Sequence, residues 1–250
     1  MVALIREYQK DNEGKMYIQF KGFFWNYFKA NKAKRSYSQS GEDIIVMNIF
    51  SQLKNYRKTF IDVGAHHPIF LNNTNLLYKN GWHGINIEPN PNMYKYFLKY
   101  RKKDINLNIG ILDKQSEIIF YEMSPPTMST FSKHEAEKLY GENGYLIVST
   151  KNVQVDTIEN VVNRYCQGEC PAFMSLDVEG FENKILESIN FKEMSPIVIC
   201  AETISFSTKG HGVKEYELIK LITDKGYFVY ADTYINTIFV NSEHWGKNHV

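Results

Sequence analysis

From residue 58 onward, the chain alternates between short apolar runs that end in polar or turn residues and segments with helical periodicity. Such apolar runs are typical of buried strands. Seven of them belong to the predicted sheet: 58–65, 83–89, 105–112, 172–180, 196–203, 227–233 and 236–242. The segments between them predict five helices: 72–81, 91–102, 155–165, 181–189 and 213–226. This alternation predicts an α/β fold with a mostly parallel seven-stranded sheet and helices on both faces.

Two further segments do not follow this alternation. Residues 116–123 (SEIIFYEM) predict an added strand outside the main series. Residues 124–152 are rich in Pro, Ser, Thr, Gly and Lys without clear periodicity, and predict a long, partly irregular segment next to the site. We therefore expect one domain over residues 36–250.

Residues 1–35 predict an N-terminal amphipathic aromatic helical extension. One helical stripe is formed by five aromatic residues: Phe20, Phe23, Phe24, Tyr27 and Phe28. Basic residues follow the stripe, so one interpretation is a helix at a membrane interface. The other, which stripes of this kind favour, is a helix that covers the domain or forms a homodimer contact.

Composition narrows the class of protein. Hydrophobic residues make up 43% and charged residues 23% of the 250 residues, which is typical of a soluble globular protein. The net charge of +1 argues against broad nucleic-acid binding. The sequence contains no run of about 18 apolar residues, so we expect no stable membrane insertion. Three cysteines and no signal-like N-terminus predict a cytoplasmic protein without a disulfide framework.

Polar residues recur where the predicted strands end. In open parallel sheets, ligands bind at the carboxyl ends of the strands, so these residues are the candidates for a site. They are Asp62, Gly64, Ala65 and His66, then Glu88, then Asn108 and Gly110, then Asp177 and Glu179, and finally Glu202.

The first two strand ends fit a nucleoside. Gly64 allows a ligand to approach the backbone, and Glu88 can accept hydrogen bonds from ribose hydroxyls. A dinucleotide site would favour G-x-G-x-x-G, whereas the sequence after the first strand reads GAHHPIF. A nucleoside without phosphates, such as S-adenosylmethionine, needs only the single glycine turn. A nicotinamide-linked dehydrogenase is accordingly disfavoured.

Four of these strand-end motifs, DVGAHH, NIEPNP, SLDVEGFENKILES and IVICAET, resemble those of the FkbM-type methyltransferases. The preceding SQSGEDIIV and the closing INTIFV resemble segments of the same family, so the resemblance extends over about residues 36–242. It implies a Rossmann-like class I methyltransferase fold and methyl transfer from S-adenosylmethionine to a hydroxyl of a sugar or nucleotide-linked sugar, in surface-polysaccharide or natural-product biosynthesis.

The resemblance also implies roles for individual residues. His67 is less typical of the family at its position, so we assign it no contact with the cofactor. The implied cofactor-binding residues are Gln39, Ser40, Asp43, Asp62, Gly64, Ala65, His66, Glu88, Asn108 and Gly110.

A sugar hydroxyl is barely acidic, so its methylation requires a general base or a divalent metal. Asp177 and Glu202 end predicted neighbouring strands and resemble the metal-binding acids of catechol-type O-methyltransferases, which makes both of them candidates for catalysis and for binding Mg²⁺ or Mn²⁺. His211 lies on a Gly-flanked loop and is a third catalytic candidate. The opposing interpretation of Asp177 is a strand-end acid that caps the next helix.

Three alternatives stay open. One is a small-molecule methyltransferase directed at nitrogen or a carboxyl group, another a nucleotide-sugar-modifying enzyme on the same scaffold, and the third a binding protein without chemistry. The sequence does not identify the acceptor. We expect its selection to depend on residues 124–152, which include Ser129, Thr130 and Phe131, and on the loop 204–212.

Overall fold

The computed structural model describes residues 7–10, 16–19, 35–141, 144–178, 180–205 and 212–248. The chain divides into two compact units, Met1–Arg35 and Ser36–Val250. In the first unit, strands β1 (Glu7–Lys10) and β2 (Met16–Gln19) pair antiparallel. The predicted aromatic helix falls on residues 20–28, outside the described residues.

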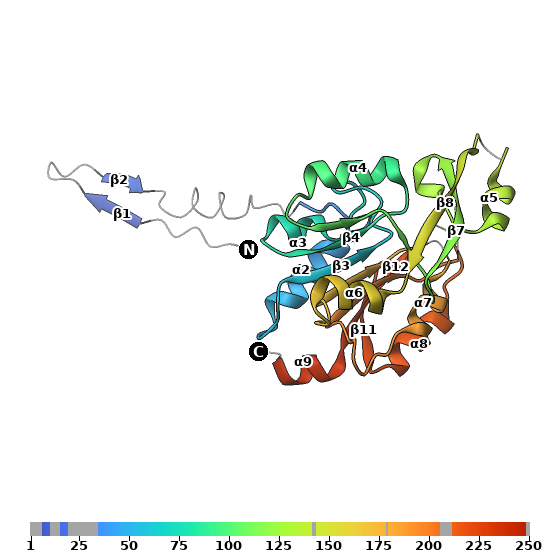
Figure 1. The fold of residues 1–250 in the computed structure, drawn as a ribbon. Coiled ribbons are helices and arrows are strands. Elements are labelled where there is room, and N and C mark those ends of the chain that lie inside the picture. Colours follow the sequence, from blue (N-terminus) through green and yellow to red (C-terminus); the bar gives the residue numbers. More distant parts are fainter. Residues whose placement is uncertain are drawn as a thin grey trace. The chain divides into compact units, whose positions relative to one another are not determined.

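The second unit is built around a seven-stranded sheet (Figure 1). Its strand order is β11-β12-β10-β9-β3-β4-β5, and only the pairings of β12, with β10 and β11, are antiparallel, which confirms the predicted α/β class and mostly parallel sheet. The strands are β3 (Thr59–Val63), β4 (His83–Ile87), β5 (Ile105–Leu107), β9 (Phe173–Leu176), β10 (Val198–Glu202), β11 (Tyr227–Asp232) and β12 (Asn236–Asn241).

Helices cover both faces of this sheet, and each face has its own apolar core. Buried side chains of α6, α7 and α8 pack on one face, and those of α2 and α3 pack on the other. Central strand β9 is buried along its whole length, as its continuous apolar run predicts. The helices are α2 (Glu42–Ser51), α3 (Asn75–Lys79), α4 (Pro91–Tyr100), α5 (Lys133–Leu139), α6 (Ile158–Cys166), α7 (Glu182–Ser188), α8 (Tyr216–Asp224) and α9 (Ser242–Asn248).

A second, three-stranded sheet has the order β6-β8-β7. The predicted third strand 105–112 is therefore split, because β6 (Gly110–Ile111) leaves the main sheet to pair with β8. The added strand is confirmed as β7 (Ser116–Ser124).

The prediction of an irregular segment over residues 124–152 is wrong in its second half. Strand β8 (Leu146–Asp156) pairs antiparallel with β7 over most of its length, and a short 3-10 helix η1 (Pro126–Met128) precedes α5. The helix expected from residue 155 begins later, because the Thr157 hydroxyl accepts the hydrogen bond from the Asn160 amide that caps α6. Among the described residues, no helix is long and apolar enough to cross a bilayer.

Candidate active site

A cavity of about 480 Å³ lies at the carboxyl ends of the parallel strands. This is the place where open α/β sheets bind ligands, and the volume suits one cofactor-sized molecule. Strand ends form its base and residues 126–131 form a wall. The described lining residues are Gln39, Val63, Gly64, His66, Leu71, Ile87, Glu88, Pro89, Gly110, Ile111, Phe120, Pro126, Thr127, Met128, Ser129, Thr130, Phe131, Asp177, Val178, Glu202, Ile204 and Ile235.

Gly64 brings two strand ends together. Its φ of +76° lies in the left-handed region, and a Cβ built on it would lie 1.7 Å from the backbone oxygen of Asp177. The Asp177 amide in turn donates to the Val63 carbonyl at 3.0 Å. The sequence pattern attributes this glycine to the approach of a ligand, whereas the structure shows that the neighbouring strand end also requires it.

Glu88 is a buried acid at the end of β4, only 6% exposed. Its Oε2 accepts the His66 amide and its Oε1 accepts the Asn90 amide, both at 2.7 Å. Burial raises the pKa of Glu88 to about 8; the carboxylates of Asp62 and Asp177 add to this, and the two amide bonds oppose it. Each carboxylate oxygen can accept more than one hydrogen bond, so Glu88 remains able to accept from a ligand.

His66 reaches the cavity wall through an unusual backbone conformation with φ of +51°. Burial, with His67 adding, lowers the pKa of His66 to about 4, so the imidazole is neutral at pH 7. His67 instead caps a turn, because its Nδ1 accepts the amides of Ile69 and Phe70 at 3.2 and 3.1 Å. The paired histidines thus have separate roles, one at the cavity and one in the loop.

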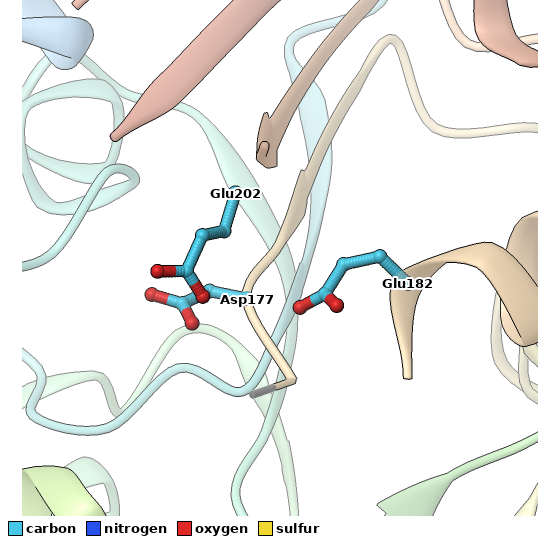
Figure 2. A group of neighbouring side chains, drawn as sticks. All are labelled: Asp177, Glu182 and Glu202. Atoms are coloured by element: carbon cyan, nitrogen blue, oxygen red, sulfur yellow. The ribbon is translucent and has the colours of Figure 1, made fainter. Parts of the chain in front are cut away.

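Three carboxyl groups converge near the ends of β9 and β10. Atoms of Asp177, Glu182 and Glu202 lie within 4.8 Å of one another, and Figure 2 shows Glu182 reaching from α7 toward the other two. Burial raises the pKa of Asp177 to about 6, while a side-chain hydrogen bond with Glu202 acts in the opposite direction. This pair can take up a proton, and the three carboxylates suit a hard divalent cation.

Glu182 is a member of this group that was not predicted from the sequence. Its Oε1 accepts the Val178 amide at 2.8 Å and its Oε2 accepts the Gly180 amide at 3.0 Å, so it also braces the turn after β9. Burial raises its pKa to about 7. Its position in the first turn of α7, five residues after Asp177, was the available signal.

The structure separates the predicted site residues into two groups. The cavity wall contains Gln39, Gly64, His66, Glu88, Gly110, Asp177 and Glu202. Five more predicted residues lie outside that lining: Ser40, Asp43, Asp62, Ala65 and Asn108. Glu179 and His211 lie outside the described residues.

Asp62 is buried and turned into the protein rather than toward the cavity. It accepts the Thr74 hydroxyl at 2.7 Å and the Asn72 amide at 3.1 Å. Arg101, fully buried, donates to both partners, at 3.0 Å and 3.2 Å, and forms an ion pair with Asp104 at 2.8 Å. This network fixes the loop that carries His66 to the cavity.

Two more of the predicted residues outside the cavity lining, Asp43 and Asn108, also support loops. The Asp43 carboxylate accepts the Tyr37 amide at 2.7 Å and the Ser36 hydroxyl at 2.7 Å, which orders the segment that carries Gln39. Asn108 donates to the Glu88 carbonyl at 2.8 Å. These residues hold cavity-lining residues in place through the backbone.

A further buried acid, Glu42, was not predicted either. It accepts the Thr233 hydroxyl at 2.7 Å and the Asn236 amide group at 3.2 Å, and thereby ties the start of α2 to the end of the sheet. Burial is the largest single cause and raises the pKa of Glu42. The hydrogen bonds from Thr233, from Ser38 and from the backbone amides of residues 40 and 42 together outweigh it, so the pKa is lowered.

The chain was compared with known proteins. Among solved structures, the chain is similar to a TehB-like SAM-dependent methyltransferase from Corynebacterium glutamicum (10% identity, 87% of this chain and 94% of that chain, TM-score 0.44). It is also similar to a putative caffeoyl-CoA O-methyltransferase from Staphylococcus aureus (8% identity, 86% and 88%, TM-score 0.41). A third is Aeropyrum pernix fibrillarin with bound S-adenosyl-L-methionine (10% identity, 96% and 99%, TM-score 0.35).

No curated protein sequence matches the chain. The family description "Methyltransferase FkbM domain", in contrast, matches residues 62–229. This match begins within β3 and includes Gly64, Glu88, Asp177 and Glu202, the strand-end residues of the cavity. The chain therefore belongs to the FkbM methyltransferase family and is an S-adenosylmethionine-dependent methyltransferase.

Proposed function

We propose that this enzyme methylates a hydroxyl group of a sugar-class small molecule. The order of strands supports an orientation for the cofactor. Glu88 ends β4, Gly64 follows β3, and Asp177 and Glu202 come at the ends of β9 and β10. In this orientation the ribose binds at Glu88, the methionine portion crosses Gly64, and the acceptor lies beside the two acids.

The Asp177–Glu202 pair is the observation that carries this proposal. In the transfer, the acceptor oxygen forms a bond to the methyl carbon while the bond from that carbon to the sulfonium sulfur breaks. The acceptor proton passes to the carboxyl pair. Since burial brings the pKa of Asp177 to about 6, the pair can hold a proton near neutral pH without holding it too tightly to release.

A divalent ion is the other way to use these acids. Asp177, Glu182 and Glu202 offer hard oxygen donors that suit Mg²⁺ or Mn²⁺. Such an ion would lower the pKa of the acceptor hydroxyl. We include it in the proposal as a component to be tested.

The charged residues of the cavity limit which acceptor molecules we propose. Among the lining residues that the structure describes, three carry carboxyl groups and none is lysine or arginine. A phosphate inside the cavity would meet these acids without a described cation. We therefore propose an acceptor whose reacting end is uncharged. An amine is the second candidate for the accepting group, because the same acids would favour a cation.

The experiment replaces Asp177 by Asn and measures two quantities, binding of S-adenosylhomocysteine by calorimetry and methyl transfer from labelled S-adenosylmethionine. We expect cofactor binding to be retained and the transfer rate to fall by about 10²–10⁴, the usual contribution of a general base. Asp224→Asn is the matched control, since that side chain is exposed on α8.

The acceptor panel pairs uncharged sugars with the same sugars carrying a phosphate group, and adds amino sugars. Transfer to the uncharged sugars supports the proposal, and transfer to the amino sugars alone supports the amine. Transfer confined to the phosphorylated sugars contradicts the charge argument. Calorimetry with Mn²⁺ alone tests the metal, because heat that is lost in Asp177→Asn and retained in Asp224→Asn locates the ion. Failure to bind S-adenosylhomocysteine by the folded wild type would overturn the cofactor orientation.

A further inference from the structure

Helix α4 carries an exposed surface that the proposed reaction does not use. Most surface helices bury an apolar stripe, yet α4 buries only Phe97. Large apolar or aromatic side chains and lysines occupy its outer side and the turn after it. This α4 surface consists of Lys95, Tyr96, Leu98, Lys99, Tyr100, Lys102, Lys103 and Ile105, all exposed.

The apolar part of the surface is substantial. Tyr96 is 44%, Leu98 51% and Tyr100 42% exposed. The Tyr96 ring lies 5.3 Å from the ring of His67, and this contact places the 67–70 turn, with Phe70 64% exposed, beside the helix. Figure 1 shows α4 on the outside of the second unit, where its outer side is not covered by another element of that unit.

The charge of the surface is one-sided. Between residues 89 and 112 the only acidic residue is Asp104. Its side chain is fully buried and paired with Arg101, which is buried as well. The four lysines of the α4 surface are therefore not offset by an exposed acid from the same segment, although the net charge of the whole chain is only +1.

We propose that the α4 surface binds peripherally to the surface of an anionic lipid bilayer. Lysines attract anionic headgroups, while tyrosine and leucine enter the boundary between headgroups and acyl chains. Tyrosine suits this boundary because its ring is apolar and its hydroxyl is polar. A soluble polyanion would use the lysines alone and would leave the exposed Tyr96, Leu98 and Tyr100 without a role.

On helix α4, Lys95, Tyr96, Lys99 and Tyr100 occupy positions i, i+1, i+4 and i+5, so they share one side of the helix. The same side can therefore present both chemistries to a flat surface. The 67–70 turn connects this side of the helix to the cavity, because Phe70 is exposed next to the helix and the following residue, Leu71, lines the cavity. Docking through α4 would thus bring the cavity close to the bilayer surface.

The test is co-sedimentation of the full chain with vesicles of phosphatidylcholine alone and of phosphatidylcholine mixed with phosphatidylserine. We expect binding to the mixed vesicles and little to the neutral ones. The double variant Lys95→Gln with Lys99→Gln should bind about thirtyfold more weakly, since each lysine near an anionic bilayer contributes about fivefold. The double variant Tyr96→Ser with Tyr100→Ser should also bind more weakly.

The matched control removes two exposed lysines elsewhere, Lys138→Gln with Lys220→Gln, on α5 and α8. It changes the net charge equally and should bind like the wild type. Thermal unfolding and S-adenosylhomocysteine binding verify that every variant is folded.

Three results would overturn the proposal. The first is an absence of preference for anionic vesicles, and the second is an equal loss in the control. The third is vesicle binding that depends on the lysines but not on the tyrosines, together with equally lysine-dependent binding of the protein to soluble dextran sulfate. That last result would assign the surface to a soluble polyanion instead.

Discussion

Replacing Gly64 by alanine tests the contact between the ends of β3 and β9. Two costs follow from the structure. A non-glycine residue at φ of +76° costs about 1 kcal/mol, and a Cβ placed 1.7 Å from the Asp177 backbone oxygen forces two buried strand ends apart. Overpacking of this kind costs about 1–3 kcal/mol. We therefore expect Gly64→Ala to lose about 2–4 kcal/mol of unfolding free energy.

Gly81→Ala is the matched control, because Gly81 has a nearly identical φ of +82° and a Cβ added there would meet nothing within 4 Å. It should lose only the backbone part, about 1 kcal/mol. For a domain of this size, about 2–4 °C of melting temperature corresponds to each kcal/mol. Scanning calorimetry should give a decrease of about 4–16 °C for Gly64→Ala and about 2–4 °C for Gly81→Ala. Equal decreases would refute the steric reasoning.

Two other predictions concern buried charges. Glu88→Gln should weaken S-adenosylhomocysteine binding by about 10–100-fold, since hydrogen bonds to a charged group contribute about 1.5–3 kcal/mol. In the wild type the pKa of Glu88 lies near 8, so binding of the ribose to the ionised carboxylate releases a proton. The affinity measured by calorimetry should therefore rise with pH up to about 8 in the wild type and stay flat in Glu88→Gln. Equal pH profiles of the two proteins would contradict this role of Glu88. Arg101→Met should lose about 3–5 kcal/mol in denaturant unfolding, because Asp104 would keep a buried charge without its partner. Its control, Lys102→Met, changes an exposed neighbour and should lose little, so similar losses in both variants would refute the buried-pair argument.

The main sheet could be predicted from the sequence because four of its parallel strands, β3, β4, β9 and β10, are largely buried. Each then appears as a continuous apolar run, and the polar residue that ends the run marks the edge where ligands bind. Strand β8 lacks this signal. Exposed and half-buried residues alternate along most of its length, and the exposed set mixes Leu146 and Val148 with Asn152 and Gln154. Without a uniformly polar outer face, the period of two was hidden in the sequence.

Arg101 shows why buried charges were not predicted. It lies in the run KYRKKD, where every other basic residue is exposed, and nothing local distinguishes it from its neighbours. Its burial is decided by distant partners: the Phe60 and Tyr78 rings at 5.3 and 4.6 Å, and the hydroxyl of Thr74. Those contacts exist only after the sheet has brought residues 60–104 together.

In the acids of the site, distant partners decide the role of a residue, just as they decide the burial of Arg101. Asp62 and Asp177 occupy similar places in the sequence pattern, yet only Asp177 lines the cavity. Asp62 lies inside β3, opposite Ser175 of β9, whereas Asp177 follows the last residue of β9. Their partners differ as well. Thr74 and Asn72 already donate to Asp62, whereas the partner of Asp177 is another acid, Glu202. A carboxyl group supplied with neutral donors stabilises a loop, while one paired with a second carboxyl group has a proton or a cation to exchange. An acid at a strand end therefore indicates the location of the site, and the donors around it, which only the folded chain supplies, decide its part in the chemistry.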